Sequence, residues 1–505
     1  MSSSTVSQDS QHTLEKSFKM HWVWAIAFGS AIGWGSFVLP VTWMSEGGPF
    51  GMIIGFTIGA VMMSTVGIST GYLIRAFPVS GGAFTYAYLC FGRNHAFVCG
   101  WFLILGYAAI VALNASAFGL MVKFLFPGIV ETGLLYSVAG WDVYLGQIII
   151  VTAVLLLFAW LNIRGAGVSG EVQFWFVVVL LVGAWTLLVC MGVAPSTSFS
   201  NLTPAFKPDV GIWGSILAFV AISPWAFIGF DSIPQTAEEF NFSHKKATKL
   251  ILGALAVATI HYAVMMIATG LAMPWTELAA GDYVWGTGYA IQSVLGNAGL
   301  AILVLALAMG IFTGLIGFYI ATSRLMFAMA RAKALPPSFG RLHSTHRTPY
   351  NGIVFCCLIC MLAPWFGRSV LLWIVSMSAV GVSIAFLYYG LVAYRLFRWS
   401  HTSPDTHFSQ EVAPLKKLIA LIASLFSIAI LGLLLIPGTP SSLTMPSWIA
   451  LFFWIAIGTM FYAMYGSEYR KASKEDLDAL VLGKAQQDTK IKVCWLDTDT
   501  TASSS

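Results

Sequence analysis

Twelve stretches of this sequence are apolar over about 20 residues, the length that a helix needs to cross the hydrocarbon core of a bilayer. They cover residues 22–44, 50–74, 97–123, 144–162, 171–193, 212–237, 248–273, 298–330, 351–366, 369–397, 415–436 and 446–466. Only 9% of the 505 residues are charged, whereas soluble domains carry about 25%. Burying so much apolar surface in water would require a larger core than single domains form. We therefore predict an all-α integral membrane protein with about 12 transmembrane helices.

The basic residues indicate which side of the membrane each loop faces. With twelve spans, the segments 1–20 and 467–505 share one side with alternate loops, and nearly all of the 26 Lys and Arg residues lie there. Only Lys123, Lys207 and Arg368 lie on the other side. Because cytoplasmic loops carry an excess of Lys and Arg, we predict a multi-pass protein of the plasma or inner membrane with both termini in the cytoplasm. The first 20 residues lack the apolar core of a cleavable signal peptide.

Several functional classes lack their motifs in this sequence. It contains no GxxxxGK[ST] phosphate loop and no HExxH, so ATP-driven transport and zinc-protease chemistry are not expected. The basic loops follow membrane topology and form no nucleic-acid surface. Cys356, Cys357 and Cys360 lie close together, but no neighbouring His or carboxylate completes a metal site, so we interpret them as packing residues. We expect no enzyme activity, cofactor or metal.

Two of the apolar stretches are interrupted by glycine and proline. The first contains Gly33, Gly35 and Pro40, and the sixth contains Pro224, Gly229 and Pro234. They begin about 190 residues apart, and each opens a block of five stretches. Interrupted segments at matching positions of two halves are typical of inverted-repeat transporters, whose substrate lies between the breaks near the midplane. Exposed amides bind a carboxylate and exposed carbonyls bind an ammonium, so the pair favours a zwitterion such as an amino acid. The alternative is that both breaks are packing kinks.

Several motifs resemble those of the amino acid–polyamine–organocation permeases. They lie over about residues 20–400 and are GWGSF (33–37), FPVSGGAFTYAY (77–88), LNIRGAGVSGEVQ (161–173), PWAFIGFD (224–231), AEEFNFSHKKATKLI (237–251) and SRLMFAMARAKALP (323–336). The resemblance implies a LeuT-type fold of five-plus-five inverted repeats, about 21–195 and 211–400, in a core of residues 21–400. Residues 401–466 would add two further transmembrane helices after this core. Residues 1–20 would form an N-terminal tail before the core, and residues 467–505 a C-terminal tail after the last helix.

The same resemblance implies a substrate site at the two breaks. The backbone amides near Gly33, Trp34, Gly35 and Ser36 would hold the carboxylate of the substrate. The carbonyls of Ala31, Trp225 and Ile228 would hold its amine. Trp225 matches an aromatic gate of some relatives, and Asp231 matches an acidic residue that some proton-linked relatives use.

Two positions depart from the family pattern. Trp34 stands where relatives have a small Ser or Thr. Its larger side chain would favour small or flat solutes. Leu180 stands where many proton-coupled members carry a Lys, so a proton mechanism cannot depend on that Lys here.

Four polar residues inside the apolar stretches are open to two interpretations each, because buried ionisable and polar groups are either functional or satisfied locally. Asp231 either titrates during transport or caps the broken helix, and His261 is either a proton relay or a histidine bonded to a carbonyl. Thr313 either contributes to a sodium site or bonds its own backbone. Asn114 contacts either substrate or another helix. Asp231, Trp225, His261 and Thr313 are thus the candidates for coupling or gating.

We therefore predict a secondary transporter that moves an amino acid or related amine by alternating access, either by symport with a proton or sodium ion or in exchange for a counter-substrate. The alternatives are an amino-acid-sensing, transport-like receptor and a polyamine or amine antiporter.

Overall fold

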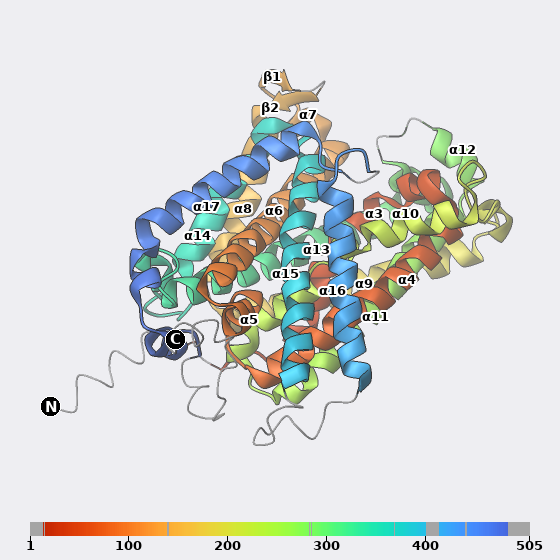
Figure 1. Ribbon diagram of the computed structural model, residues 1–505. Coiled ribbons are helices and arrows are strands. Elements are labelled where there is room, and N and C mark those ends of the chain that lie inside the picture. The colour runs from red at the N-terminus through yellow and green to blue at the C-terminus, as the bar shows by residue number, and fades with distance from the viewer. Residues whose placement is uncertain are drawn as a thin grey trace.

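The computed structural model describes residue 14 and residues 16–138, 141–281, 283, 285–367, 369–399, 414–439 and 442–482 (Figure 1). The described residues form 17 α-helices, five 3₁₀ segments and one hairpin. The α-helices are α2 (Met20–Ile32), α3 (Gly35–Val38), α4 (Pro40–Ala76), α5 (Gly82–Phe91), α6 (Arg93–Leu125), α7 (Pro127–Val130), α8 (Leu145–Ile163), α9 (Ala166–Val193), α10 (Gly211–Ala226), α11 (Ala247–Gly270), α12 (Trp275–Ala280), α13 (Gly286–Arg331), α14 (Tyr350–Cys360), α15 (Ser369–Trp399), α16 (Pro414–Leu435), α17 (Met445–Lys471) and α18 (Lys474–Leu482). The 3₁₀ segments are η1 (Phe199–Leu202), η2 (Phe230–Glu239), η3 (His244–Lys246), η4 (Pro337–Gly340) and η5 (Ala363–Phe366).

Ten helical segments within the described residues are long and apolar enough to cross a membrane, and Met20–Ile32 and Tyr350–Phe366 are shorter apolar helices. The difference from the twelve predicted stretches lies in the first and the ninth, whose helices are short, and for the first the cause is local. The 37 residues of α4 join the end of the first stretch to all of the second through a kink at Gly48, where φ is 75°. The expectation of a nearly all-helical membrane protein is confirmed.

The outward-facing side chains fit a lipid environment. Val182, Val189 and Val193 on α9 are 59–76% exposed, and Phe452 and Phe453 on α17 are 62% and 68% exposed. In water such surfaces would promote association, whereas lipid tails solvate them. The helices α9, α16 and α17 therefore present apolar faces to the bilayer, around more deeply buried helices such as α6.

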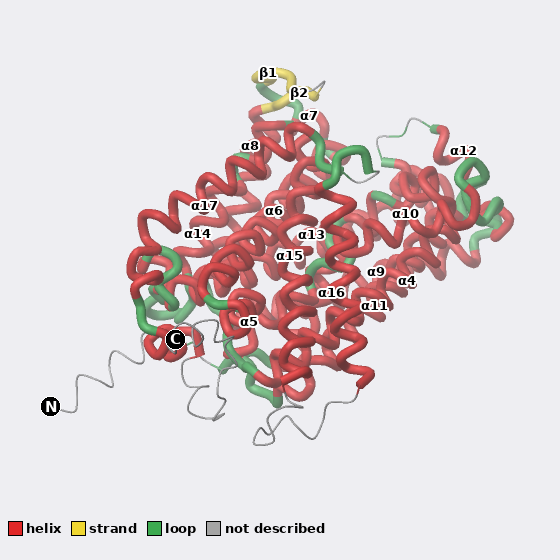
Figure 2. Tube along the Cα trace, in the orientation of Figure 1, coloured by secondary structure: helices red, strands yellow, loops and turns green. Residues whose placement is uncertain are grey.

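The structure adds two elements that the sequence reasoning missed. Strands β1 (Leu134–Val138) and β2 (Trp141–Tyr144) pair as a short antiparallel hairpin at one end of the helical body (Figure 2). Helix α5 lies toward the opposite end and begins at Gly82, directly after Gly81, and the φ values of Gly81 and Gly82 are 101° and 44°. Residues 82–91 lie outside all twelve predicted stretches, yet every residue from Gly82 to Cys90 is buried.

The last described helix, α18, lies against α13 and is bonded to α5. Its Leu477, Val481 and Leu482 are buried, and the Tyr88 hydroxyl donates to Asp478 Oδ1 at 3.0 Å. Arg93 donates to three carbonyls at the end of α17, those of Tyr469, Arg470 and Ala472. These contacts attach α18 to α5 and the end of α17 to the start of α6.

The packing of α18 is expected to weaken as the pH rises. Burial raises the pKa of the Asp478 carboxyl above 3.8, against smaller opposing effects of Tyr88 and Lys474. The packed helix binds this proton more tightly than the released helix. Packing is therefore strongest below pH 3.8, and it weakens as the pH rises through the raised pKa of Asp478. The mobility of a nitroxide attached at Ala479→Cys should therefore increase with pH.

Asp478→Asn should abolish this pH dependence, because it removes the titrating group. Asp476→Asn is the matched control, since the side chain of Asp476 on the same helix is exposed. A pH response that survives Asp478→Asn would contradict the assignment.

Candidate functional site

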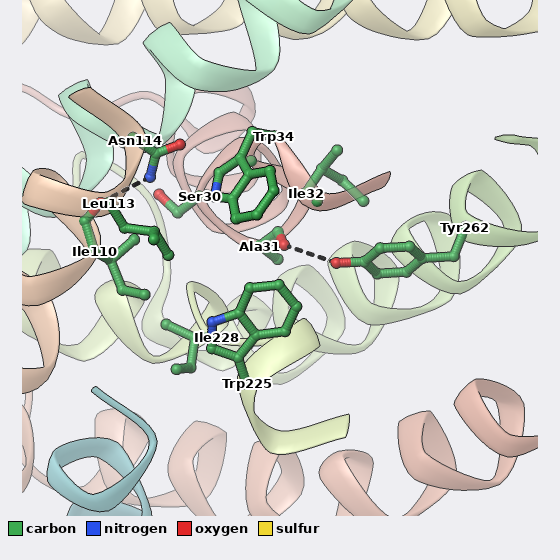
Figure 3. Close-up of a pocket in the computed structure, with 12 residues that line it drawn as sticks. Ser30, Ala31, Ile32, Trp34, Ile110, Leu113, Asn114, Trp225, Ile228 and Tyr262 are labelled. Atoms are coloured by element: carbon green, nitrogen blue, oxygen red, sulfur yellow. Dashed lines mark hydrogen bonds between the residues drawn. The ribbon is translucent and has the colours of Figure 1, made fainter. Parts of the chain in front are cut away.

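A small cavity lies where the two interrupted segments meet (Figure 3). Its volume is about 30 Å³. Twelve residues line it: Ser30, Ala31, Ile32, Gly33, Trp34, Gly35, Ile110, Leu113, Asn114, Trp225, Ile228 and Tyr262. They come from α2, the turn after it and the start of α3, from α6, from α10 and the turn after it, and from α11.

Both interruptions are produced by glycine in backbone conformations that other residues avoid. Helix α2 ends at Gly33, with φ 46° and ψ −147°, and α3 starts two residues later. Helix α10 ends at Ala226, and η2 begins after Gly229, with φ 136° and ψ −35°. A Cβ on Gly229 would lie 2.5 Å from the Ala31 nitrogen. The two breaks are therefore in direct backbone contact.

The structure brings six of the seven predicted binding residues to this cavity. Ala31, Gly33, Trp34, Gly35, Trp225 and Ile228 line it. Ser36 does not: its side chain is fully buried, and its hydroxyl lies 3.1 Å from His261 Nε2. His261 also lies outside the lining, with its ring edge-on to Phe28 and Phe37. His261 thus contacts a hydroxyl of the first segment, a partner that neither sequence interpretation had named.

Tyr262 is a lining residue that the sequence reasoning missed. Its hydroxyl lies 2.7 Å from the Ala226 carbonyl at the end of α10 and 3.3 Å from the Ala31 carbonyl in α2. A hydroxyl has one proton, so the shorter distance identifies Ala226 as its main acceptor. Tyr262 therefore joins the two breaks from α11, although it is one tyrosine within an apolar stretch and nothing in the sequence singles it out.

Two tryptophan rings from opposite breaks face each other across the cavity (Figure 3). The ring centroids of Trp34 and Trp225 are 6.4 Å apart, with an interplanar angle of 69°. A volume of 30 Å³ accommodates about two water molecules. A solute as large as an amino acid therefore requires these rings to move.

Asp231 lies beside the second break, and both of its carboxylate oxygens are engaged. Oδ1 accepts from the Gly229 amide at 2.9 Å, and the Tyr107 hydroxyl lies 2.8 Å from both Oδ2 and the Asp231 carbonyl oxygen, which share its one proton. The first contact is the helix-capping arrangement that the sequence allowed. The second links the break to α6, and Gln235 Nε2 lies 3.5 Å from the same Tyr107 oxygen.

Thr313 lies between α13 and the first segment. Its hydroxyl is 3.0 Å from the Gly29 carbonyl and 2.8 Å from the Gly310 carbonyl of its own helix. Beside it, the Gln173 amide of α9 donates to the carbonyls of Ala25 and Thr313, both at 3.2 Å. These bonds hold α2, α9 and α13 together, and the sequence reasoning missed the part of Gln173. Leu180 is buried on the same α9.

Away from the cavity, the start of α2 is fixed against the end of η2. The Phe18 amide donates to the Glu239 carbonyl at 3.0 Å, and the Asn241 amide donates to the Phe18 carbonyl at 3.1 Å. The Glu239 carboxylate accepts two bonds from Arg324 of α13, at 2.7 and 3.1 Å, and both side chains are almost fully buried. These bonds join the segment before α2 to the end of η2 and to α13.

Within the described residues, no group of three or more His, Cys, Asp or Glu side chains is placed to hold a metal ion. Cys356, Cys357 and Cys360 are buried in α14, and the Cys360 thiol lies 3.2 Å from the Ala108 carbonyl.

Comparisons with known proteins identify this architecture. A family model described as amino acid permease matches residues 19–461. The chain is 28% identical over 459 residues to the methylthioribose transporter of Bacillus subtilis, covering 89% of this chain and 93% of the relative. It is 26% identical over 456 residues to the branched-chain amino acid permease BcaP of Lactococcus lactis (88% and 94% coverage). It is also 24% identical over 435 residues to the lysine-specific permease LysP of Escherichia coli (82% and 85% coverage). The chain therefore belongs to the amino acid permease family of the amino acid–polyamine–organocation superfamily and is a multi-pass membrane transporter of amino acids or related compounds.

Proposed function

We propose that this permease is a secondary active transporter that carries a small amino acid or related amine by alternating access. The observation that carries the proposal is the cavity at the contact between the two broken segments. A solute held there interacts with both segments at once. Movement of one segment against the other would then expose it to either side of the membrane in turn.

The fold we propose is a LeuT-type five-plus-five inverted repeat with two further helices, twelve spans in all. Two observations support it. The first and sixth predicted stretches are both broken, at Gly33 and Gly229, and the breaks touch. The two shorter helices, Met20–Ile32 and Tyr350–Phe366, coincide with the first and ninth stretches, and the first is continued by the start of α4. Both termini would lie in the cytoplasm, as the distribution of basic residues predicts.

We propose that the substrate lies with its carboxylate toward the amides that begin the second half of the broken first helix. Helical turns continue from Gly35 through Leu39 into α4, because the Leu39 amide donates to the Gly35 carbonyl and the Trp43 amide to the Leu39 carbonyl. The positive end of this half-helix points to the cavity. The carbonyls of Ala31, Trp225 and Ile228 then face the ammonium group.

Flux into proteoliposomes tests this function. The purified permease would be offered a pool of radiolabelled amino acids and amines, with the interior loaded or empty, under a proton gradient, a sodium gradient or neither. Accumulation that needs an ion gradient would establish symport and name the ion, and uptake that needs a loaded interior would establish exchange. Exchange restricted to polyamines or other amines would favour the antiporter instead. Binding without flux under every condition would overturn transport in favour of a receptor.

Asp231→Asn tests whether the buried carboxylate carries coupling. We expect the variant to lose gradient-driven accumulation and to retain measurable binding, because the cavity lining is unchanged while the titratable group is removed. Tyr107→Phe is the matched comparison, since it removes the hydroxyl that donates to Asp231 Oδ2 and leaves the carboxylate. Unchanged accumulation in Asp231→Asn would assign Asp231 a capping role only.

Trp34→Ser tests the limit on substrate size. Removing the indole vacates one wall of the cavity, so amino acids with bulkier side chains should become substrates. The measurement is competition by a series of amino acids of increasing size against a transported one. A substrate range equal to that of the unaltered permease would show that Trp34 does not set the limit.

A further inference from the structure

The cavity lining carries unpaired polar atoms and no charged side chain. Among its twelve residues, which all lie in the described part of the chain, none is Asp, Glu, Lys, Arg or His. Three side-chain atoms in the lining are buried without a hydrogen-bond partner: Ser30 Oγ, Asn114 Oδ1 and Trp225 Nε1. They comprise one acceptor, one donor and one hydroxyl that can serve as either. Such a lining matches a dipolar occupant without net charge.

Asn114 is the most constrained of the three residues. It is 1% exposed, and its amide nitrogen donates to the Ile110 carbonyl one turn earlier at 2.9 Å. That bond fixes the orientation of the amide group and leaves Oδ1 as the free atom. A buried carbonyl oxygen without a donor is costly, so a donor is expected in the cavity.

The Asn114 side chain fits beside two glycines from other segments because these glycines have no side chains. A Cβ on Gly33 would lie 3.5 Å from Asn114 Oδ1, and a Cβ on Gly314 of α13 would lie 2.6–2.8 Å from three atoms of the amide group. Asn114 therefore lies where α6 meets the first break and α13. A hydrogen bond formed at this position acts on three segments at once.

Asp231, the acidic residue of the second break, does not line the cavity and so offers no direct ion-pair partner there. Both carboxylate oxygens of Asp231 are already bonded, to Gly229 and to Tyr107. A cationic side chain of a substrate would lose its hydration on entering the cavity and would find no anionic partner there. Burying an unpaired charge in this way is strongly unfavourable.

We propose that the site selects amino acids with uncharged side chains and that Asn114 is a specificity-determining residue, whose Oδ1 accepts a hydrogen bond from the substrate. The proposal rests on the proposed function, because it assigns the substrate class of the same cavity. The donor is the substrate's ammonium group or a polar N–H or O–H of its side chain. Trp34 and Trp225 cover the remaining, apolar part of the solute.

Competition on the unaltered permease gives the first test. Radiolabelled alanine, leucine, serine and glutamine should be transported, whereas lysine and putrescine should compete at least about tenfold more weakly. Lysine transported as well as leucine would overturn the neutral class while leaving transport itself established. Absence of flux for every solute, by contrast, would contradict the proposed function.

Asn114→Leu gives the second test. Loss of the acceptor should raise the half-saturation concentration roughly 10- to 100-fold, because hydrogen bonds to charged groups contribute on that scale. An equal rise for alanine and serine would identify the ammonium group as the donor. A rise confined to serine and glutamine would identify their side chains. Unchanged values for all substrates would overturn the role of Asn114.

Asn162 offers a matched control. It is also 1% exposed, its amide nitrogen donates to the Phe158 carbonyl one turn earlier at 2.8 Å, and its Oδ1 has no partner among the described residues. Asn162 lies on α8, outside the cavity lining. Asn162→Leu should therefore show any folding cost of such a change without the loss of affinity.

A nearly isosteric change keeps the proposal testable if Asn114→Leu does not fold. Asn114→Asp places a carboxylate in the lining, so neutral substrates should weaken and lysine should become an effective competitor. Asn162→Asp should leave the selectivity unchanged. A folded Asn114→Asp variant with the selectivity of the unaltered permease would contradict the assignment.

Discussion

Arg324→Met is expected to lower the free energy of unfolding by about 3–5 kcal/mol, because it leaves the buried Glu239 carboxylate without its partner. Arg324 and Glu239 are 1% and 4% exposed at their side chains, and Arg324 supplies both donors to the carboxylate. The guanidinium also lies 5.6 Å from the centroid of the Phe18 ring, so the start of α2 should loosen as well. Unfolding in mixed micelles of increasing denaturing detergent measures the loss.

Two comparisons separate the buried charge from simple loss of packing. Adding Glu239→Gln to Arg324→Met should recover much of the stability, because no buried charge then remains unpaired. Lys123→Met removes the cation of a more exposed pair, with Lys123 and Glu131 side chains 28% and 40% exposed; such pairs contribute about 1 kcal/mol or less. Equal losses for Arg324→Met and Lys123→Met would refute the argument.

Gly229→Ala should reduce transport by at least about 30-fold. Its φ of 136° costs a residue with a side chain about 1–3 kcal/mol. The added Cβ would lie 2.5 Å from the Ala31 nitrogen and 2.7 Å from the Ser30 carbonyl carbon, and overpacking against such atoms costs about 1–3 kcal/mol more. The lower end of the sum, about 2 kcal/mol, corresponds to about 30-fold. Initial uptake rates, normalised to folded protein, measure the effect.

Gly192→Ala is the control for replacing a glycine in a membrane helix where there is room for a side chain. Gly192 lies in α9, and a Cβ at this position would meet no atom within 4 Å. Its uptake should equal that of the unaltered permease. If Gly229→Ala transported equally well, the two breaks would not be in contact during the transport cycle.

The sequence by itself determined the class of the protein and the places where its helices break. An apolar stretch of about 20 residues is a membrane segment whatever its neighbours are, because the bilayer acts as its solvent. Gly33 and Gly229 interrupt helices through their own backbone freedom, which is also a local property. Six of the seven binding residues that the family resemblance implied lie at one cavity, because the matching motifs lie at the two breaks.

Only the tertiary structure decided which side chains face the cavity and which face away from it. Ser36 turns to His261 on α11 rather than into the cavity, while Asn114 and Tyr262 enter from helices that are unbroken at those positions. The buried pair of Arg324 and Glu239 joins residues 85 positions apart. In apolar helices without a strongly polar face, sequence periodicity does not determine the rotation about the helix axis. That rotation follows from packing between distant segments, and it selects the groups that can contact a substrate.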